Sequence, residues 1–151
     1  MPYRSSLKTL TLLHISLLTV LVLSTVFAYL QNGNFTAQIE RSDILIYVVP
    51  ILAAAGYFAS LFFFQKLLTN IKREERLETK LRRYLTASLV KYALLGVPTL
   101  LATMAYYING NALHLVIGIS LTAYLFAQRP TVSKLVKDVP LSNEEQKQCE
   151  T

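Results

Sequence analysis

The chain has 151 residues, of which 53% are hydrophobic and 16% are charged, and its formal net charge is +6. A soluble domain carries about 25% charged residues. Here the charges are fewer and grouped, which leaves long apolar windows typical of membrane spans. The basic residues flank these windows, as at a membrane surface, so we expect no nucleic-acid partner. The single cysteine, Cys149, excludes an internal disulfide and argues against a cysteine metal site or a thiol oxidoreductase.

The first predicted span covers residues 7–31. Arg4 and Lys8 precede its core, as basic residues do in a signal peptide. However, the apolar run of about 23 residues is longer than the usual core of such a signal, about 7–15 residues. We therefore predict an uncleaved transmembrane helix, which ends where Asn and Gly residues favour a turn.

The second predicted span covers residues 43–68 and contains a group of small residues. Spacings of four residues place these side chains in pairs along the helix, where they allow another helix to approach closely. We predict that they form a helix-packing face, made of Ala55, Gly56, Ala59 and Ser60.

A charged segment, residues 70–83, separates the two halves of the chain. Its leucines fall on one side of a helical wheel and its basic residues on another, which predicts a helix that lies at the membrane surface or extends the neighbouring spans. Two interpretations stay open: a solvated connector, or a cytoplasmic contact surface for anionic lipid head groups or an acidic partner. The predicted basic surface consists of Lys72, Arg76, Lys80 and Arg83.

The second half repeats the layout of the first. Spans are predicted at residues 84–108 and 112–128, joined by a tight turn, and a polar cytoplasmic tail follows at 129–151. Within the tail, Ser142 and Glu145 have the spacing of a helix capping box. The predicted fold is therefore all-α: a single membrane domain, residues 1–151, with four transmembrane helices in two antiparallel hairpins.

The positive-inside rule predicts the orientation. With both chain ends in the cytoplasm, every basic residue except Arg41 and the intramembrane Lys91 lies on the cytoplasmic side. We predict an N-in/C-in protein of the bacterial inner membrane. The ends of the first and third spans also match at one fixed offset, residues 27–34 against 104–111. Two interpretations stay open: an internal duplication, or chance similarity between apolar helices with turn-forming ends.

Ionisable residues inside a span are candidates for function because they are costly to bury. The same offset aligns His14 with Lys91, each about 10 Å from the cytoplasmic end of its span. With Gln65 and Ser88 they are predicted to form an intramembrane polar site for an anion or a lipid phosphate. The alternative is structural: the Lys91 ammonium extends to the head groups, and His14 donates to a neighbouring helix.

The sequence contains no catalytic motif, phosphate loop or metal-ligand spacing, so we predict no catalytic residue, metal site or cofactor. The favoured hypothesis is a non-enzymatic accessory, assembly or oligomer-forming subunit, acting as a homo-oligomer or within a larger membrane complex. The alternative is a transporter or binder of an anion or anionic lipid that uses His14 and Lys91.

Overall fold

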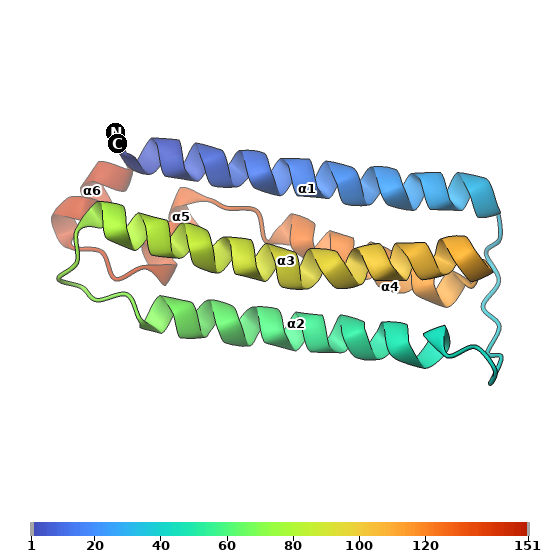
Figure 1. Cartoon of the computed structure of the whole chain (residues 1–151). Helices are drawn as coiled ribbons and strands as arrows, with labels where there is room; N and C mark the ends of the chain where they lie inside the picture. Colours follow the sequence, from blue (N-terminus) through green and yellow to red (C-terminus); the bar gives the residue numbers. More distant parts are fainter. Residues whose placement is uncertain (1, 151) are drawn as a thin grey trace.

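The computed structural model describes residues 2–150 and shows six α-helices and no β-strand in this part of the chain (Figure 1). The four long helices are α1 (Pro2–Asn32), α2 (Leu45–Thr69), α3 (Leu77–Asn109) and α4 (Ala112–Ala127). Two short helices follow, α5 (Val132–Asp138) and α6 (Asn143–Glu150). The prediction of an all-helical protein is confirmed for these residues.

Successive long helices run in opposite directions, which gives the bundle two distinct ends (Figure 1). The near end holds the start of α1, the α2–α3 connection, α5 and α6. The far end holds residues 33–44, which join α1 to α2, and the turn Gly110–Asn111, which joins α3 to α4.

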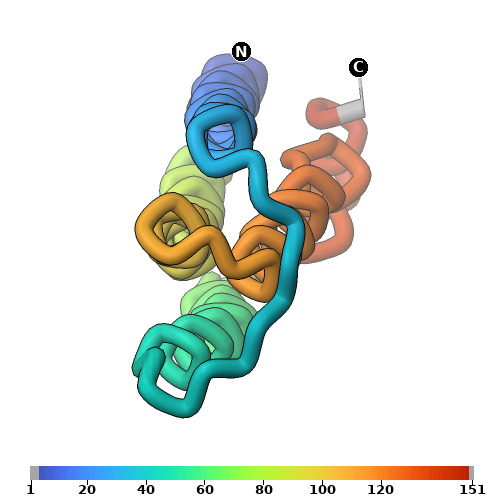
Figure 2. Tube along the Cα trace, turned by 90° about the vertical axis from the view of Figure 1, so that its right-hand side faces the viewer, coloured from blue at the N-terminus to red at the C-terminus, as the bar shows by residue number. Residues whose placement is uncertain are grey.

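Helix α3 is the centre of the bundle, with α1 and α2 on opposite sides of it and α4 beside it (Figure 2). Half of its most apolar window is buried inside the protein, against 28% for α2 and 17% for α1. Helices α1 and α2 thus do not form the packed hairpin that the sequence suggested. Residues 33–44 are long enough to cross the far end past α4, whereas the two-residue turn Gly110–Asn111 holds α3 and α4 side by side.

The approach of α2 to α3 depends on a missing side chain at Gly56. A Cβ atom there would lie 2.5 Å from Cγ of Pro98. Ser60, one turn further along α2, is fully buried. Ala55 is exposed and Ala59 is half-buried. The four small residues therefore do not form one packing face: Gly56 and Ser60 are buried, whereas Ala55 is exposed. Gly56 contacts α3 of the same chain.

Helices α1, α2 and α3 are each long and apolar enough to cross a membrane. Helix α4 has 16 residues and extends about 24 Å, less than the hydrocarbon core of about 30 Å. It reaches spanning length only together with α5, from which a bend of 84° separates it. Large apolar side chains such as Leu30, Phe58 and Ile108 cover the outside of the bundle. These features fit a multi-pass membrane protein with three or four spans.

Residues 129–150 fold back on the near end instead of extending as a polar tail. Leu135, Val139 and Leu141 are buried in the same apolar core as Ile71 and Leu81. Leu135 is the buried residue of α5, and Val139 and Leu141 follow in the connection to α6, so both the helix and the segment after it bury apolar side chains against the bundle. The core of the protein thus continues beyond the ends of α2 and α4.

We expect Gly56→Leu to lower the free energy of unfolding by about 3 kcal/mol or more, because the new side chain has to displace Pro98 in a close-packed contact. Ala55→Leu is the matched control, since Ala55 is exposed on the same helix. Thermal unfolding of both variants in detergent measures the difference. Equal stability of the two variants would contradict the packing of α2 on α3.

Candidate functional site

The ammonium group of Lys91 is buried at the near half of the bundle, where α3 meets the end of α4. The residue is 8% exposed. Its Nζ donates a hydrogen bond of 2.7 Å to Oε1 of Gln128 and lies 4.5 Å from the centre of the Phe64 ring. A buried cation is stabilised by such an acceptor and by the face of an aromatic ring. Lys91 is therefore bonded within the protein, at the end of α4.

The imidazole of His14 packs against Tyr92, the residue after Lys91 on α3, and has no polar partner within residues 2–150. His14 is 1% exposed, and its ring centre is 4.8 Å from that of Tyr92. Neither ring nitrogen has a hydrogen-bond partner there. A buried polar atom without a partner costs about 1–3 kcal/mol, so the position of His14 calls for an explanation beyond packing.

Helix α5 brings two further charges to the site. Lys134 acts electrostatically on both His14 and Lys91, and Asp138 acts on Lys91. Nζ of Lys134 donates a hydrogen bond of 2.9 Å to the backbone oxygen of Ala127, at the end of α4. Two lysines and one carboxylate are thus near enough to influence one another electrostatically. The arrangement has an excess of positive charge and is suited to an anion.

The break between α4 and α5 gives the site its shape. Pro130 is buried at the break, and proline prevents α4 from continuing because its ring clashes with the preceding turn and it lacks an N–H donor. The chain turns by 84° there. Gln128 is left at the level of Lys91, and α5 returns Lys134 to the same place.

We call the group formed by His14, Lys91, Gln128 and Lys134 the buried cationic cluster, after its two buried members, His14 and Lys91; Gln128 and Lys134 are half-buried. Two of its members, His14 and Lys91, are predicted from the sequence. Ser88, also predicted, is buried on α3 one turn before Lys91, but Gln65 is exposed on α2. The hydrogen-bond acceptor for Lys91 is instead Gln128, which directly follows the last residue of α4. Gln65 has a similar position, near the end of α2. The break at Pro130 is the signal that favours Gln128.

The predicted basic surface is also altered by the fold. Lys72, Arg76 and Arg83 are exposed, whereas Lys80 is fully buried and pairs with Oε2 of Glu145 at 2.8 Å. Helix α6 folds over this part of α3, which no helical-wheel pattern within residues 70–83 can indicate. The helix itself begins at Leu77, so residues 70–76 form a connection and the remainder extends α3.

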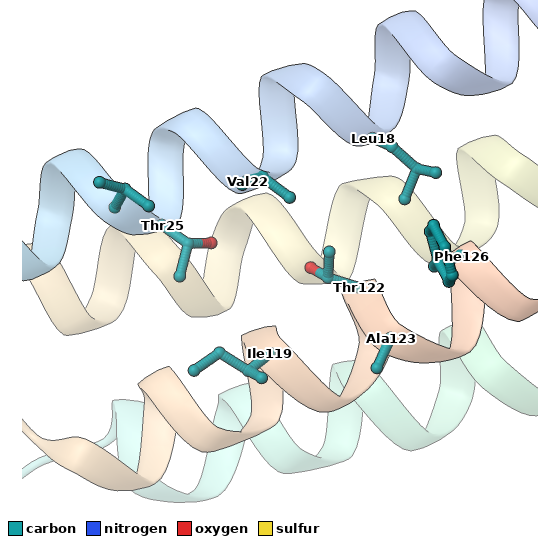
Figure 3. Close-up of a pocket in the computed structure, with 8 residues that line it drawn as sticks. Leu18, Val22, Thr25, Ile119, Thr122, Ala123 and Phe126 are labelled. Carbon is teal, nitrogen blue, oxygen red and sulfur yellow. The ribbon is translucent and has the colours of Figure 1, made fainter.

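An apolar groove between α1 and α4 leads away from the buried cationic cluster (Figure 3). Its volume is about 470 Å³. Leu18 of the groove lies one turn after His14, and Phe126 lies two residues before Gln128. The remaining lining residues are Val22, Thr25, Val26, Ile119, Thr122 and Ala123.

The far end has a separate polar network that joins its two connections. Nδ2 of Asn32 donates hydrogen bonds to the backbone oxygens of Tyr106 and Tyr107, at 2.7 and 3.0 Å. The hydroxyl of Tyr106 donates to the backbone oxygen of Asn34 at 2.6 Å. The Asn32 side chain thus caps the last turn of α3, where the Tyr106 oxygen also accepts from the Gly110 N–H at 2.8 Å.

His114 belongs to the same end of the bundle. Nδ2 of Asn109 lies 2.6 Å from Oδ2 of Asp43 and 3.2 Å from Nε2 of His114. These contacts connect the start of α2 to the start of α4. They give His114 a structural role in holding the far end together.

Searches against protein-family models, curated proteins and solved structures find no significant match to this chain. Within residues 2–150, no group of three or more His, Cys, Asp or Glu side chains is placed to hold a metal ion.

Acid is expected to release α6 from α3. Burial raises the pKa of Glu145, but the hydrogen bonds from Lys80 and Ser142 and the Lys80 charge outweigh it, so the pKa lies below the ordinary value of 4.5. A carboxyl group whose pKa is lower in the folded state adds stability above its unfolded pKa and loses it as pH falls through the folded pKa. We expect stability to fall below about pH 4.5, measured by thermal unfolding in detergent across the acid range.

Two variants test this assignment. Glu145→Gln should lower stability at neutral pH by about 2 kcal/mol, the size of a charge-assisted hydrogen bond, and should flatten the acid dependence. Glu144→Gln, at the exposed neighbouring position, should change neither. An acid dependence that persists in Glu145→Gln would show that another group is responsible.

The two buried histidines should respond differently to replacement by leucine. His14→Leu removes two unpartnered nitrogens and should raise the free energy of unfolding of the ligand-free protein by about 1 kcal/mol. His114→Leu removes one unpartnered nitrogen, Nδ1, and also the contact of Nε2 with Asn109; these effects offset each other, so it should stabilise less than His14→Leu. Thermal unfolding in a neutral detergent measures both. A loss of stability in His14→Leu would mean that His14 has a purely structural role.

Proposed function

We propose that this protein binds an anionic group at the buried cationic cluster and does so without catalysis. The observation that carries the proposal is that the buried, unpartnered imidazole of His14 packs against Tyr92, whose neighbour on α3 is the buried Lys91. Charged residues inside membrane helices are costly and are retained mainly where they contribute to function. An anion would give His14 a partner and would balance the excess positive charge of Lys91 and Lys134.

The proposal includes an orientation: four spans, with α4 and α5 forming the last one, and both chain ends in the cytoplasm of a bacterial cell, in the inner membrane. The positive-inside rule supports it, because the near end carries nearly all the basic residues. In this orientation the buried cationic cluster lies in the cytoplasmic leaflet. Anionic lipid head groups are concentrated there.

We also propose that the two halves arose by duplication. Helices α1 and α3 end at Asn32 and Asn109, and each is followed by a glycine with positive φ, 62° at Gly33 and 69° at Gly110. The N–H groups of both glycines bond to a tyrosine carbonyl at 2.8 Å. His14 and Lys91 occupy equivalent positions in the aligned helices. The site would then combine equivalent positions of the two halves.

An accessory or oligomer-forming role has weaker support. The small residues that motivated it lie on α2, and Gly56 faces Pro98 of the same chain. That contact is satisfied within one molecule and leaves no need for a second copy. Anion binding is therefore the function that the geometry favours.

Anionic ligands should stabilise the protein through Lys91. Phosphatidylglycerol or inorganic phosphate, tested separately, should raise the melting temperature in detergent by roughly 5 °C at saturation, because a ligand that binds only the folded state shifts the unfolding equilibrium. Phosphatidylcholine, which has no net charge, should have no such effect. Lys91→Met should abolish the shift while the variant stays folded, since an apolar side chain of similar size tolerates burial.

The matched control is Lys66→Met. Lys66 is an exposed lysine near the end of α2, and its ammonium group lies 5.8 Å from the Phe62 ring, outside the buried cationic cluster. This variant should keep the full shift. The proposal would be overturned if neither anionic compound stabilised the protein, or if Lys91→Met responded as the unaltered protein does.

A further inference from the structure

We infer that the anion bound at the buried cationic cluster is the head group of a phospholipid, and that one of its acyl chains lies in the groove between α1 and α4. This inference rests on the proposed function and specifies its ligand. It commits to an anionic phospholipid that enters from the bilayer, because the groove begins at Leu18, one helical turn after His14 of the cluster.

The continuity is clearest along α1. His14, Leu18, Val22 and Thr25 recur at intervals of four, four and three residues, which places them on one face of the helix. Three of them line the groove, and the fourth is the unpartnered histidine of the cluster. From Leu18 to Val26 the groove follows about 12 Å of helix. The groove therefore begins one turn from the cluster and extends away from the near end.

The opposite wall is formed by α4. Ile119, Thr122, Ala123 and Phe126 line it and lead to Gln128, the hydrogen-bond partner of Lys91 (Figure 3). Ala123 has a short side chain, which leaves room between the two helices. The bend at Pro130 ends this wall at the level of the cluster.

The polar atoms in the groove do not call for a polar ligand. The Thr25 hydroxyl donates to the backbone oxygen of Leu21 at 2.8 Å, and the Thr122 hydroxyl donates to that of Gly118 at 2.8 Å. Since both hydroxyls are satisfied within their own helices, their methyl groups complete an apolar wall. Such a wall suits a hydrocarbon chain, and the positive charge at one end suits a phosphate.

A second groove provides the contrast. It lies between α1 and α3, has a volume of about 570 Å³ and is lined by apolar side chains together with Ser24 and Thr103. No charged residue lines it. It is open to ordinary membrane lipid but has nothing to select a head group. The α1–α4 groove differs in ending at a cluster with excess positive charge.

The test uses native mass spectrometry of the full chain, purified in detergent and incubated with equal amounts of phosphatidylglycerol and phosphatidylcholine. We expect one phosphatidylglycerol molecule to stay bound per chain, and little phosphatidylcholine. Glycerophosphoglycerol, the same head group without acyl chains, should not bind at the same concentration. Ala123→Phe fills the α1–α4 groove and should reduce the retained phosphatidylglycerol at least about tenfold, as a lost apolar contact of this size predicts.

Ser24→Phe is the matched control, because it introduces the same side chain into the α1–α3 groove; it should retain the lipid. Thermal unfolding confirms that each variant is folded. Val22→Trp fills the α1–α4 groove from the opposite wall and decides the question if Ala123→Phe does not fold.

Three results would overturn the inference, and they separate it from the proposed function. In the first, a folded Ala123→Phe or Val22→Trp variant retains phosphatidylglycerol while Lys91→Met loses the lipid. This result would show that the acyl chain does not lie in the groove, but it would leave the proposed anion site standing. Binding of glycerophosphoglycerol as tight as that of the lipid would have the same meaning. Equal retention by Lys91→Met and the unaltered protein would refute both.

Discussion

A buried ammonium group in an apolar bundle needs an acceptor, and the near half of this protein is arranged around the one that Lys91 finds. The acceptor is Gln128, so α4 has to end at the level of Lys91, and Pro130 ends it there. The chain then turns and α5 crosses beneath the bundle, which returns Lys134 to the site and buries Leu135. Pro130 sets the short fourth helix and the bend, and these place Gln128 and Lys134 where the buried Lys91 needs them.

The bounds of the long helices could be predicted from hydropathy to within a few residues, except at the start of α3, which begins at Leu77. The central position of α3 could not. A membrane helix is apolar on all sides, so its sequence has no stripe that distinguishes contact with protein from contact with lipid. Gly56 was recognisable as a position of close approach, but its partner Pro98 depends on the order in which the helices pack. That order is a property of the connections and of tertiary contacts.

The candidate site was predictable in part for a similar reason. His14 and Lys91 stand out because ionisable residues are rare inside apolar segments. Gln128 was not singled out, because a glutamine near a helix end is common and Gln65 occupies a similar position on α2. Lys80 was assigned to a basic surface since its neighbours along the chain are basic. Its burial depends on Glu145, which is 65 residues away in the sequence. A pattern within residues 70–83 cannot reveal so distant a partner.

The pairing of Lys80 with Glu145 also has a consequence for the order of events during synthesis. Lys80 lies near the start of α3, whereas α6 is made after all four long helices. Until residues 141–150 have been synthesised, Lys80 lacks its partner Glu145, and the apolar core around Leu81 lacks Leu141 and Cys149. The near end of the bundle is thus completed only after α6 has been made.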